Sequence, residues 1–285
     1  MKSFSNSFLV LWQVDIFFGC LILTYCSTKT FIIMENHFSN VPIWVSISFI
    51  FIFPITIYFI ARTIKQGAIN AQISDNQSNK IFLGVIMFFS LYLIYVSVMA
   101  FTGLLSVNTL PPKVLVFTAL PLIIFFFGFI FNKLIYWKIL DGIPLQSLVR
   151  LHIFRFVGVY FLLVTYFNAL PAYFAILAGL GDMATALGAI FIAKAVEENK
   201  SWIRKATLVW NIFGFLDIGS VIISAILTTK YSIEHPESQS IIEMAKFPFV
   251  WIPAFAPAVI IFIHISIFNK LKRGEGGDGL EFVLK

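Results

Sequence analysis

The chain has 285 residues, of which 59% are hydrophobic and 12% are charged, and its net charge is +6. Soluble domains carry about 25% charged residues, so this composition excludes a water-soluble fold and indicates an integral membrane protein. A helix that crosses a bilayer needs about 20 residues, so the length leaves room for several spans with short loops and excludes a large extramembrane domain.

Eight apolar stretches are long enough to cross a bilayer, and we expect each to form an α-helix. They lie at residues 8–28, 41–61, 81–107, 112–132, 151–170, 172–196, 207–229 and 248–269. Only Ala169, Leu170 and Pro171 separate the fifth stretch from the sixth; a fifth helix that ran on to Leu177 would leave Asp182 near the outer surface. The sequence therefore predicts an all-α, polytopic helix bundle with one transmembrane domain over residues 1–273 and a flexible tail over 274–285.

The fourth and eighth stretches end on the same five residues, IFNKL, at 130–134 and 267–271. The offset is near half the chain length, which favours a duplication of four helices plus four, as some transporters have. Apolar sequence of low complexity also produces such matches by chance.

Basic residues are distributed unequally between the two sides of this predicted topology. Fifteen of the 20 Lys and Arg residues fall on the side that holds both termini, and four fall on the other. The positive-inside rule therefore places both termini in the cytoplasm. The excess charge orients the chain and contacts anionic membrane lipids, whereas nucleic-acid binding would need one concentrated basic face.

Six ionisable residues of the predicted spans are informative, because such a group at the bilayer centre costs at least about 2.5–3.5 kcal/mol and is retained only if it is paired, hydrated or used. Their predicted depths put Asp217 near the middle of the membrane and four of the others in the inner leaflet. The six are Asp15, His152, Arg155, Asp182, Asp217 and His264.

Two interpretations fit these residues. In the first, Arg155 and the acids form an ion pair that holds the bundle together, which is a structural role only. In the second, the acids line a polar cavity and bind a proton or small cation, since a coupling site needs a group whose charge changes on binding. Asn168 and Asn211, together with several prolines, mark places where backbone groups are freed within the membrane, as in transporters with broken helices.

Two further functions have weaker sequence support. Residues 179–182 read Gly-Leu-Gly-Asp, the Gly-x-Gly-Asp pattern of intramembrane aspartyl proteases, whose chemistry needs a second carboxylate such as Asp217. The glycines are equally explained by close helix packing. His152 and His264 lie on different spans at similar depth, as a bis-histidine haem would require, but no other cofactor and no metal site is indicated.

From His152 to Leu271 the order of features resembles an uncharacterised family of bacterial multi-pass inner-membrane proteins. The shared features are an early Arg155, then Asn168-x-x-Pro171, Gly179-x-Gly181-Asp182, Asn211-x-x-Gly214-x-x-Asp217 and a late His264. The resemblance covers under half of the chain and implies a bacterial cytoplasmic membrane but no activity. It also implies that Asp182, Asp217 and Arg155 belong to one site.

The leading functional interpretation is therefore a carrier for a small solute or ion. Its polar site at mid-membrane consists of Asp182 and Asp217, balanced by Arg155 and supported by Asn168 and Asn211. The alternatives are an aspartyl-type membrane hydrolase, a haem protein and a non-catalytic structural protein.

Overall fold

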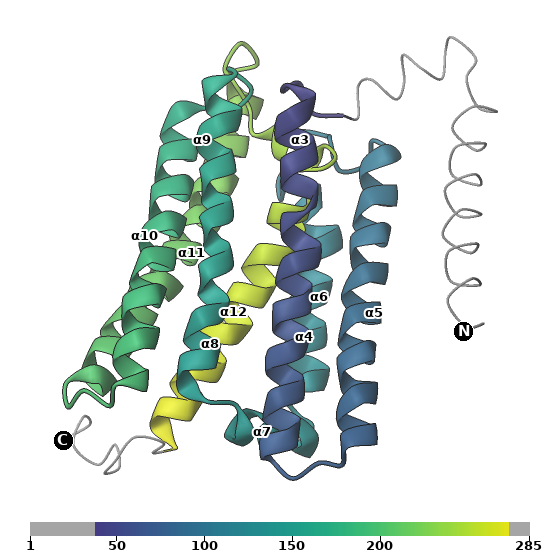
Figure 1. Cartoon of the computed structure of the whole chain (residues 1–285). Helices are drawn as coiled ribbons and strands as arrows, with labels where there is room; N and C mark the ends of the chain where they lie inside the picture. Colours follow the sequence, from purple (N-terminus) through teal and green to yellow (C-terminus); the bar gives the residue numbers. More distant parts are fainter. Residues whose placement is uncertain (1–37, 274–285) are drawn as a thin grey trace. The chain divides into compact units, whose positions relative to one another are not determined.

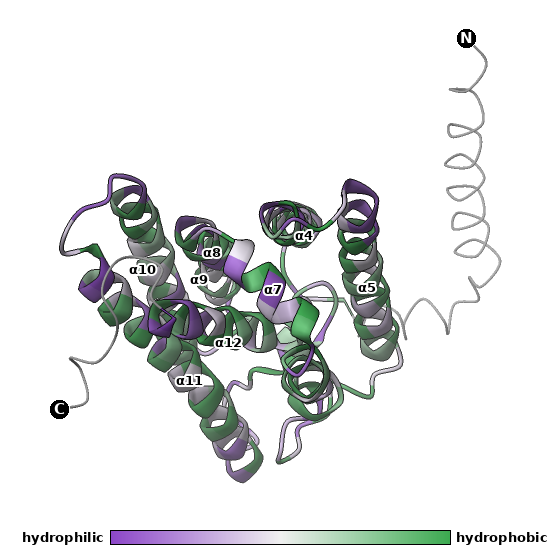
Figure 2. Cartoon of the chain, turned by 90° about the horizontal axis from the view of Figure 1, so that it is seen from below, coloured by the Kyte–Doolittle hydropathy of each residue, from purple (hydrophilic) through white to green (hydrophobic). Residues whose placement is uncertain are grey.

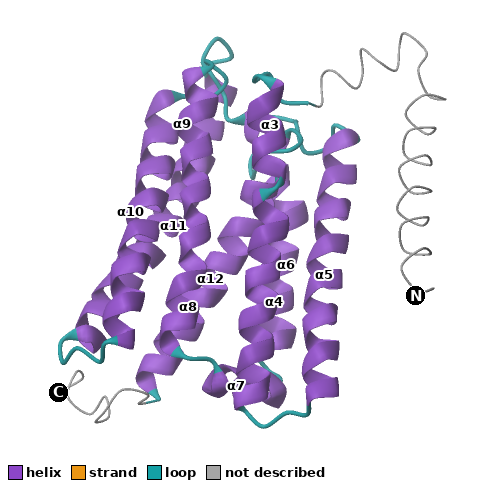
Figure 3. Cartoon of the chain, in the orientation of Figure 1, coloured by secondary structure: helices purple, strands orange, loops and turns teal. Residues whose placement is uncertain are grey.

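The computed structural model describes residues 38–273, and residues 39–273 form a helix bundle with its loops at the two ends (Figures 1 and 3). The predicted all-α fold is confirmed for this part of the chain. The predicted first span (8–28) and the C-terminal tail (274–285) lie outside the described residues. The helices, in order, are α3 (Ile43–Ile50), α4 (Ile52–Asn70), α5 (Asp75–Phe101), η1 (Leu115–Ala119), α6 (Leu120–Ile124), η2 (Phe125–Ile130), α7 (Leu134–Gly142), α8 (Leu145–Leu151), η3 (His152–Gly158), α9 (Val159–Tyr166), α10 (Ala172–Glu197), α11 (Ile203–Glu234), η4 (Ile242–Ala245) and α12 (Trp251–Lys272).

Six helices of the described chain are long and apolar enough to cross a membrane. A seventh is added if the bent pair of Leu115–Ile130 and Leu134–Gly142 counts as one span. The predicted total of eight, which includes the undescribed first stretch, stays a prediction. The six are Ile43–Asn70, Asp75–Phe101, Leu145–Tyr166, Ala172–Glu197, Ile203–Glu234 and Trp251–Lys272.

Polar residues extend some helices beyond the apolar stretches from which the spans were predicted. The predicted third span began at 81, but α5 begins at Asp75, where the Ser74 hydroxyl accepts a hydrogen bond from the Gln77 backbone N–H and caps the helix. The predicted end at 107 is wrong, because α5 ends at Phe101 and Gly103 follows with a φ of 72°.

The break between the fifth and sixth predicted spans lies where the sequence placed it. Helix α9 ends at Tyr166, and Pro171 precedes the first residue of α10. A fifth helix continuing to Leu177 is therefore excluded. The predicted start of the fifth span at 151 is wrong, however, because the helix begins at Leu145, six residues earlier.

The predicted fourth span is a short helix followed by a sharp bend. Residues 115–130 include two π-helical segments, and α7 then turns away from them by 92°. The sequence assigned residues 133–142 to a loop, so α7 was missed. The IFNKL segment at 130–134 covers this bend, whereas its counterpart at 267–271 lies within the continuous helix α12. The four-plus-four duplication therefore stays a prediction.

Helix α12 lies at the centre of the bundle, between two groups of helices (Figure 1). In its most apolar window 72% of the residues are buried, against 17% in α5. Helices α8 to α11 pack together on one side of α12, and α4, α5 and α7 pack together on the other (Figure 2). The prolines that suggested broken helices precede helices or lie in their first turns; only Pro257 lies inside α12, which continues through it.

Helix α7 packs closely on α4 because two glycines meet there. A Cβ on Gly67 would lie 2.8 Å from the Ile139 carbonyl and would collide with the Ile143 side chain. The Asn70 side chain also donates a hydrogen bond to the Gly142 carbonyl at 2.9 Å. The bend after residue 130 is therefore held by direct backbone contact between α4 and α7.

We expect Gly67→Leu to lower the free energy of unfolding by about 1–3 kcal/mol, because the added side chain has no space. Gly219→Leu is the matched control, since a Cβ on Gly219 meets no atom within 4 Å. Equilibrium unfolding of both variants in mixed detergent micelles measures the difference. Equal stability of the two variants would show that the contact between α4 and α7 is dispensable.

Candidate functional site

Arg155 lies at the centre of the bundle, is completely buried, and binds two carboxylates from different helices. Its Nε donates to Asp182 Oδ1 of α10 at 2.7 Å, and its Nη2 donates to Asp217 Oδ2 of α11. Its Nη1 donates to the Gly214 carbonyl at 3.0 Å and lies 3.3 Å from His264 Nε2 of α12. One guanidinium thus joins three other helices.

The backbone around Arg155 is a 3-10 helix, η3, set between two α-helical segments of the same span. A 3-10 helix has three residues per turn, so residues three apart lie in one row along its surface. His152, Arg155 and Gly158 form such a row and are all buried. In an α-helix each of the three would be offset from the previous one by about 60°, so the 3-10 geometry aligns them more closely on the face that packs against neighbouring helices.

Arg155 also lies deeper in its span than the sequence predicted. The predicted boundary at 151 put it in the inner leaflet, but the span runs from Leu145 to Tyr166 and Arg155 is near its middle. Asp182 lies ten residues from the start of α10, about 15 Å along it. The ion pairs therefore form near mid-depth of the bundle.

Glycines let the charged side chains approach backbone. A Cβ on Gly158 would lie 2.6 Å from the Asp182 Cβ and 2.9 Å from the Gly179 carbonyl. The Asp217 carboxylate occupies the space where a Gly181 side chain would begin. The Gly-x-Gly-Asp segment thus provides close helix contact, which is one of the two explanations that the sequence allowed.

Asn211 sets the orientation and protonation pattern of His264. The His264 Nε2 faces an Arg155 N–H and must accept, so the imidazole proton lies on Nδ1, which donates to Asn211 Oδ1 at 2.8 Å. The Asn211 Nδ2 in turn donates to the His264 backbone carbonyl at 3.1 Å. His264 is neutral in this arrangement.

His152 is the one member of the cluster with unsatisfied polar atoms. Its ring lies against that of His264, with centroids 4.1 Å apart, and packs edge-on against Trp210 at 5.2 Å. Both ring nitrogens are buried without a hydrogen-bond partner. Because buried polar atoms normally have partners, these two nitrogens lie where a water molecule would be stabilised.

The cluster contains one more negative charge than positive charge. Asp182 and Asp217 contribute two carboxylates, Arg155 contributes one cation, and His264 is neutral. Adding a proton to His152 would put a second cation beside Arg155 and leave two buried N–H groups without acceptors. The site therefore holds a net charge of −1 when both carboxylates are ionised.

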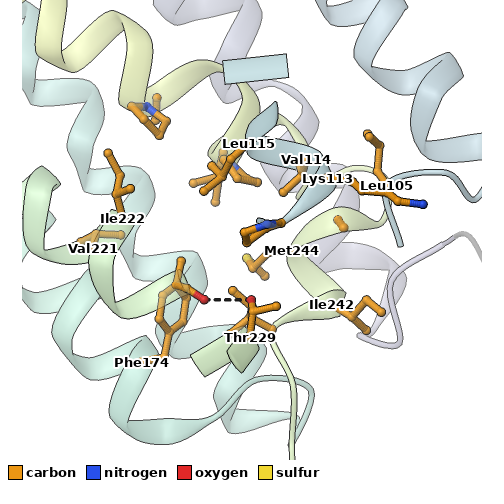
Figure 4. A pocket seen from close by; sticks show the side chains of 18 of the residues that line it. Leu105, Lys113, Val114, Leu115, Phe174, Val221, Ile222, Thr229, Ile242 and Met244 are labelled. Carbon is orange, nitrogen blue, oxygen red and sulfur yellow. Dashed lines mark hydrogen bonds between the residues drawn. The ribbon is translucent and has the colours of Figure 1, made fainter. Parts of the chain in front are cut away.

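A cavity of about 80 Å³ leads to Asp182 from the end of the bundle that carries η4. Most of its walls are apolar and come from α9, α10, α11, α12, η1, η4 and the loop after α5. Figure 4 shows Phe174, Thr229 and Met244 toward one end of this space and Leu115 toward the other. Asp182 is the one carboxylate among the lining residues.

The structure brings together most, but not all, of the residues singled out in the sequence. Arg155, Asp182, Asp217, His152, His264 and Asn211 form one cluster. Asn168 does not join it: the residue is exposed in the turn before α10 with a φ of 57°, and its carbonyl accepts from Gln239. Asp15 lies outside the described residues.

Sequence reasoning missed Trp210 and Thr185. Trp210 is buried beside His152 and donates a hydrogen bond to the Thr185 carbonyl at 3.0 Å. Its spacing along the helix could have identified Trp210 as a neighbour of the site, since it lies one turn before Gly214 and two turns before Asp217.

The geometry favours neither hydrolysis by a pair of aspartates nor haem ligation by two histidines. The Arg155 guanidinium binds both carboxylates and occupies the position of the shared water in an aspartyl dyad. The two imidazole ring centroids are 4.1 Å apart, with the ring planes tilted by 31°, which leaves no room for a porphyrin between them. Among the described residues, no group of three or more His, Cys, Asp or Glu side chains is placed to hold a metal ion.

The charge count makes a prediction about stability. Asp182→Asn or Asp217→Asn alone leaves Arg155 paired with one carboxylate and the cluster neutral, so each single variant loses little stability. The double variant buries an unpaired guanidinium, which costs about 3–5 kcal/mol. A double-mutant cycle in detergent measures this non-additivity; two single effects that simply add would contradict it.

One of the comparisons with known proteins identifies a family, and its description gives no activity. No curated protein and no solved structure matches the chain. One family model, described as a domain of unknown function (DUF8737), matches residues 110–272, which include every described member of the cluster. This match covers more than half of the 285 residues, and the chain therefore belongs to the DUF8737 family.

Proposed function

We propose that the protein is a membrane carrier that binds a proton or a small monovalent cation at Asp182 and Asp217. The observation that supports this proposal is the excess negative charge around Arg155. We further propose that it works in a bacterial cytoplasmic membrane with the α7 end of the bundle in the cytoplasm, as the distribution of basic residues predicts.

A structural ion pair needs one carboxylate for one guanidinium. Here two carboxylates bind Arg155, and both are almost completely buried, with side chains 6% and 9% exposed. An unbalanced charge at this depth is strongly unfavourable unless it is neutralised. One bound proton or monovalent cation makes the cluster neutral. Binding of this ion therefore accounts for the second carboxylate, whereas a structural role does not.

Access to the cluster also favours a carrier. The 80 Å³ cavity reaches Asp182 from the η4 end, whereas His264 and His152 lie one to two helical turns toward the α7 end. Polar side chains are therefore also present beyond Arg155, on the side opposite the cavity. A cation entering along the cavity meets Asp182 first, because Asp182 is the carboxylate that lines it.

We expect wild-type protein in liposomes to dissipate an imposed pH, sodium or potassium gradient faster than protein-free liposomes. Asp182→Asn and Asp217→Asn should each reduce this rate to that of protein-free liposomes, because either change removes the excess negative charge. Entrapped pyranine reports proton movement, and radioactive sodium or rubidium reports cation movement.

Asp141→Asn is the matched control, since this exposed carboxylate pairs with Arg273 at the surface and lies outside the cluster. Its transport rate should equal that of the wild type. Normal rates in both cluster variants, or no flux of any of these ions through the wild type, would refute the proposal and favour a structural role.

A further inference from the structure

A second, larger cavity lies at the α7 end of the bundle and is separate from the Arg155 cluster. Its volume is about 590 Å³, within the range of about 300–1,000 Å³ that ligand pockets have. It is lined by residues of α4, α5, η2, α7, α8 and α12, and no member of the Arg155 cluster lines it. The residues that define its walls include Ile64, Val85, Phe88, Phe126, Ile139 and Phe262.

The walls of this cavity suit a flexible hydrocarbon chain. Aromatic rings cover one side, with Phe88 stacked on Phe125 at 4.8 Å and Phe126 on Phe262 at 4.8 Å. Cavities lined by apolar side chains do not hold water and instead bind apolar molecules. On α5, Gly84 lines the cavity, is exposed, and has no atom within 4 Å of the position of a Cβ, so space is open beside it.

The end of the cavity at the bend before α7 is basic. Lys133 lines it, and its Nζ lies 4.3 Å from the centre of the Phe129 ring. Lys80 and Lys138 are exposed, and each is the chain neighbour of a lining residue. Asp141, the acidic residue of α7, is paired with Arg273. A ligand at this end of the cavity therefore meets mainly positive charge.

The bend also places Lys133 at the level of lipid headgroups. Helix α7 is turned by 92° from the helix that precedes it, so it lies along the membrane surface when that helix crosses the bilayer. Basic side chains at this level attract anionic lipids by about 1 kcal/mol each.

We propose that this cavity binds one acyl chain of an anionic phospholipid, with the phosphate beside Lys133. The apolar walls hold the chain, Gly84 leaves room for it to pass α5, and the basic residues at the bend select the charge of the headgroup. This site is independent of the proposed transport function.

The test uses the full-length protein and phosphatidylglycerol that carries a photoreactive diazirine in its acyl chain. After irradiation, mass spectrometry should locate the label on peptides that contain residues 81–89 and 125–130. Gly84→Leu should reduce this labelling by about tenfold, the loss expected when a few methylene groups are no longer buried. Gly219→Leu is the matched control and should label as the wild type does, because that glycine is equally open but lies outside the cavity.

A second pair of variants tests the headgroup even if Gly84→Leu folds poorly. Unlabelled dioleoyl-phosphatidylglycerol should compete with the probe better than dioleoyl-phosphatidylcholine, and Lys133→Gln should reduce that preference by about fivefold. Lys194→Gln, an exposed residue of α10 outside the cavity, should leave it unchanged.

Equal labelling of Gly84→Leu and Gly219→Leu would overturn the proposal, as would equal competition by the two lipids. A disulfide from a Gly84→Cys variant to Cys20 or Cys26 would overturn it too, because the chain's own apolar N-terminal stretch would then fill the cavity.

Discussion

The charge of Arg155 is the constraint on which the centre of this protein depends. A guanidinium keeps its charge at any physiological pH and offers five N–H donors, so it can be buried only where acceptors surround it. Helices α10 and α11 supply carboxylates, α11 also supplies the Gly214 carbonyl, and α12 supplies His264. The positions of three helices around η3 are therefore fixed by one side chain.

The two sides of α12 satisfy opposite requirements. On the side of α8 to α11, glycines such as Gly158 and Gly181 bring backbones and carboxylates into contact, so little space remains and charge is held closely. On the side of α4, α5 and α7, phenylalanine rings fill the interior less completely and leave a cavity of about 590 Å³. Helix α12 separates a compact polar region from an open apolar one.

The energetic penalty for charge in a membrane allowed much of the site to be predicted. Arg155, Asp182 and Asp217 stood out because nothing but pairing or function explains them, and they do converge. Asn168 was a poor candidate because the cost of placing an asparagine in a membrane is too small to mark a site. The residue instead lies in a turn, with a positive φ. Trp210 was missed because tryptophan is also common at interfaces. Hydropathy does not detect the polar first turns of helices, such as the one that begins at Asp75 in α5 or the one that contains Gln146 and Ser147 in α8. The bend before α7 and the 3-10 segment depend on tertiary contacts.

The 3-10 segment has a mechanical consequence for the whole span. Seven residues at about 2.0 Å per residue extend roughly 14 Å, but they would extend only about 10.5 Å as an α-helix. The same change would also alter the winding by about 20° per residue, or roughly 140° over the segment. Helix α9 would thus move toward α8 along the axis of the span and rotate about that axis. Arg155 would then turn away from Asp182 and Asp217. The 3-10 winding thus makes the span about 3.5 Å longer than a continuous α-helix would be, and it sets the rotation at which Arg155 faces the two carboxylates.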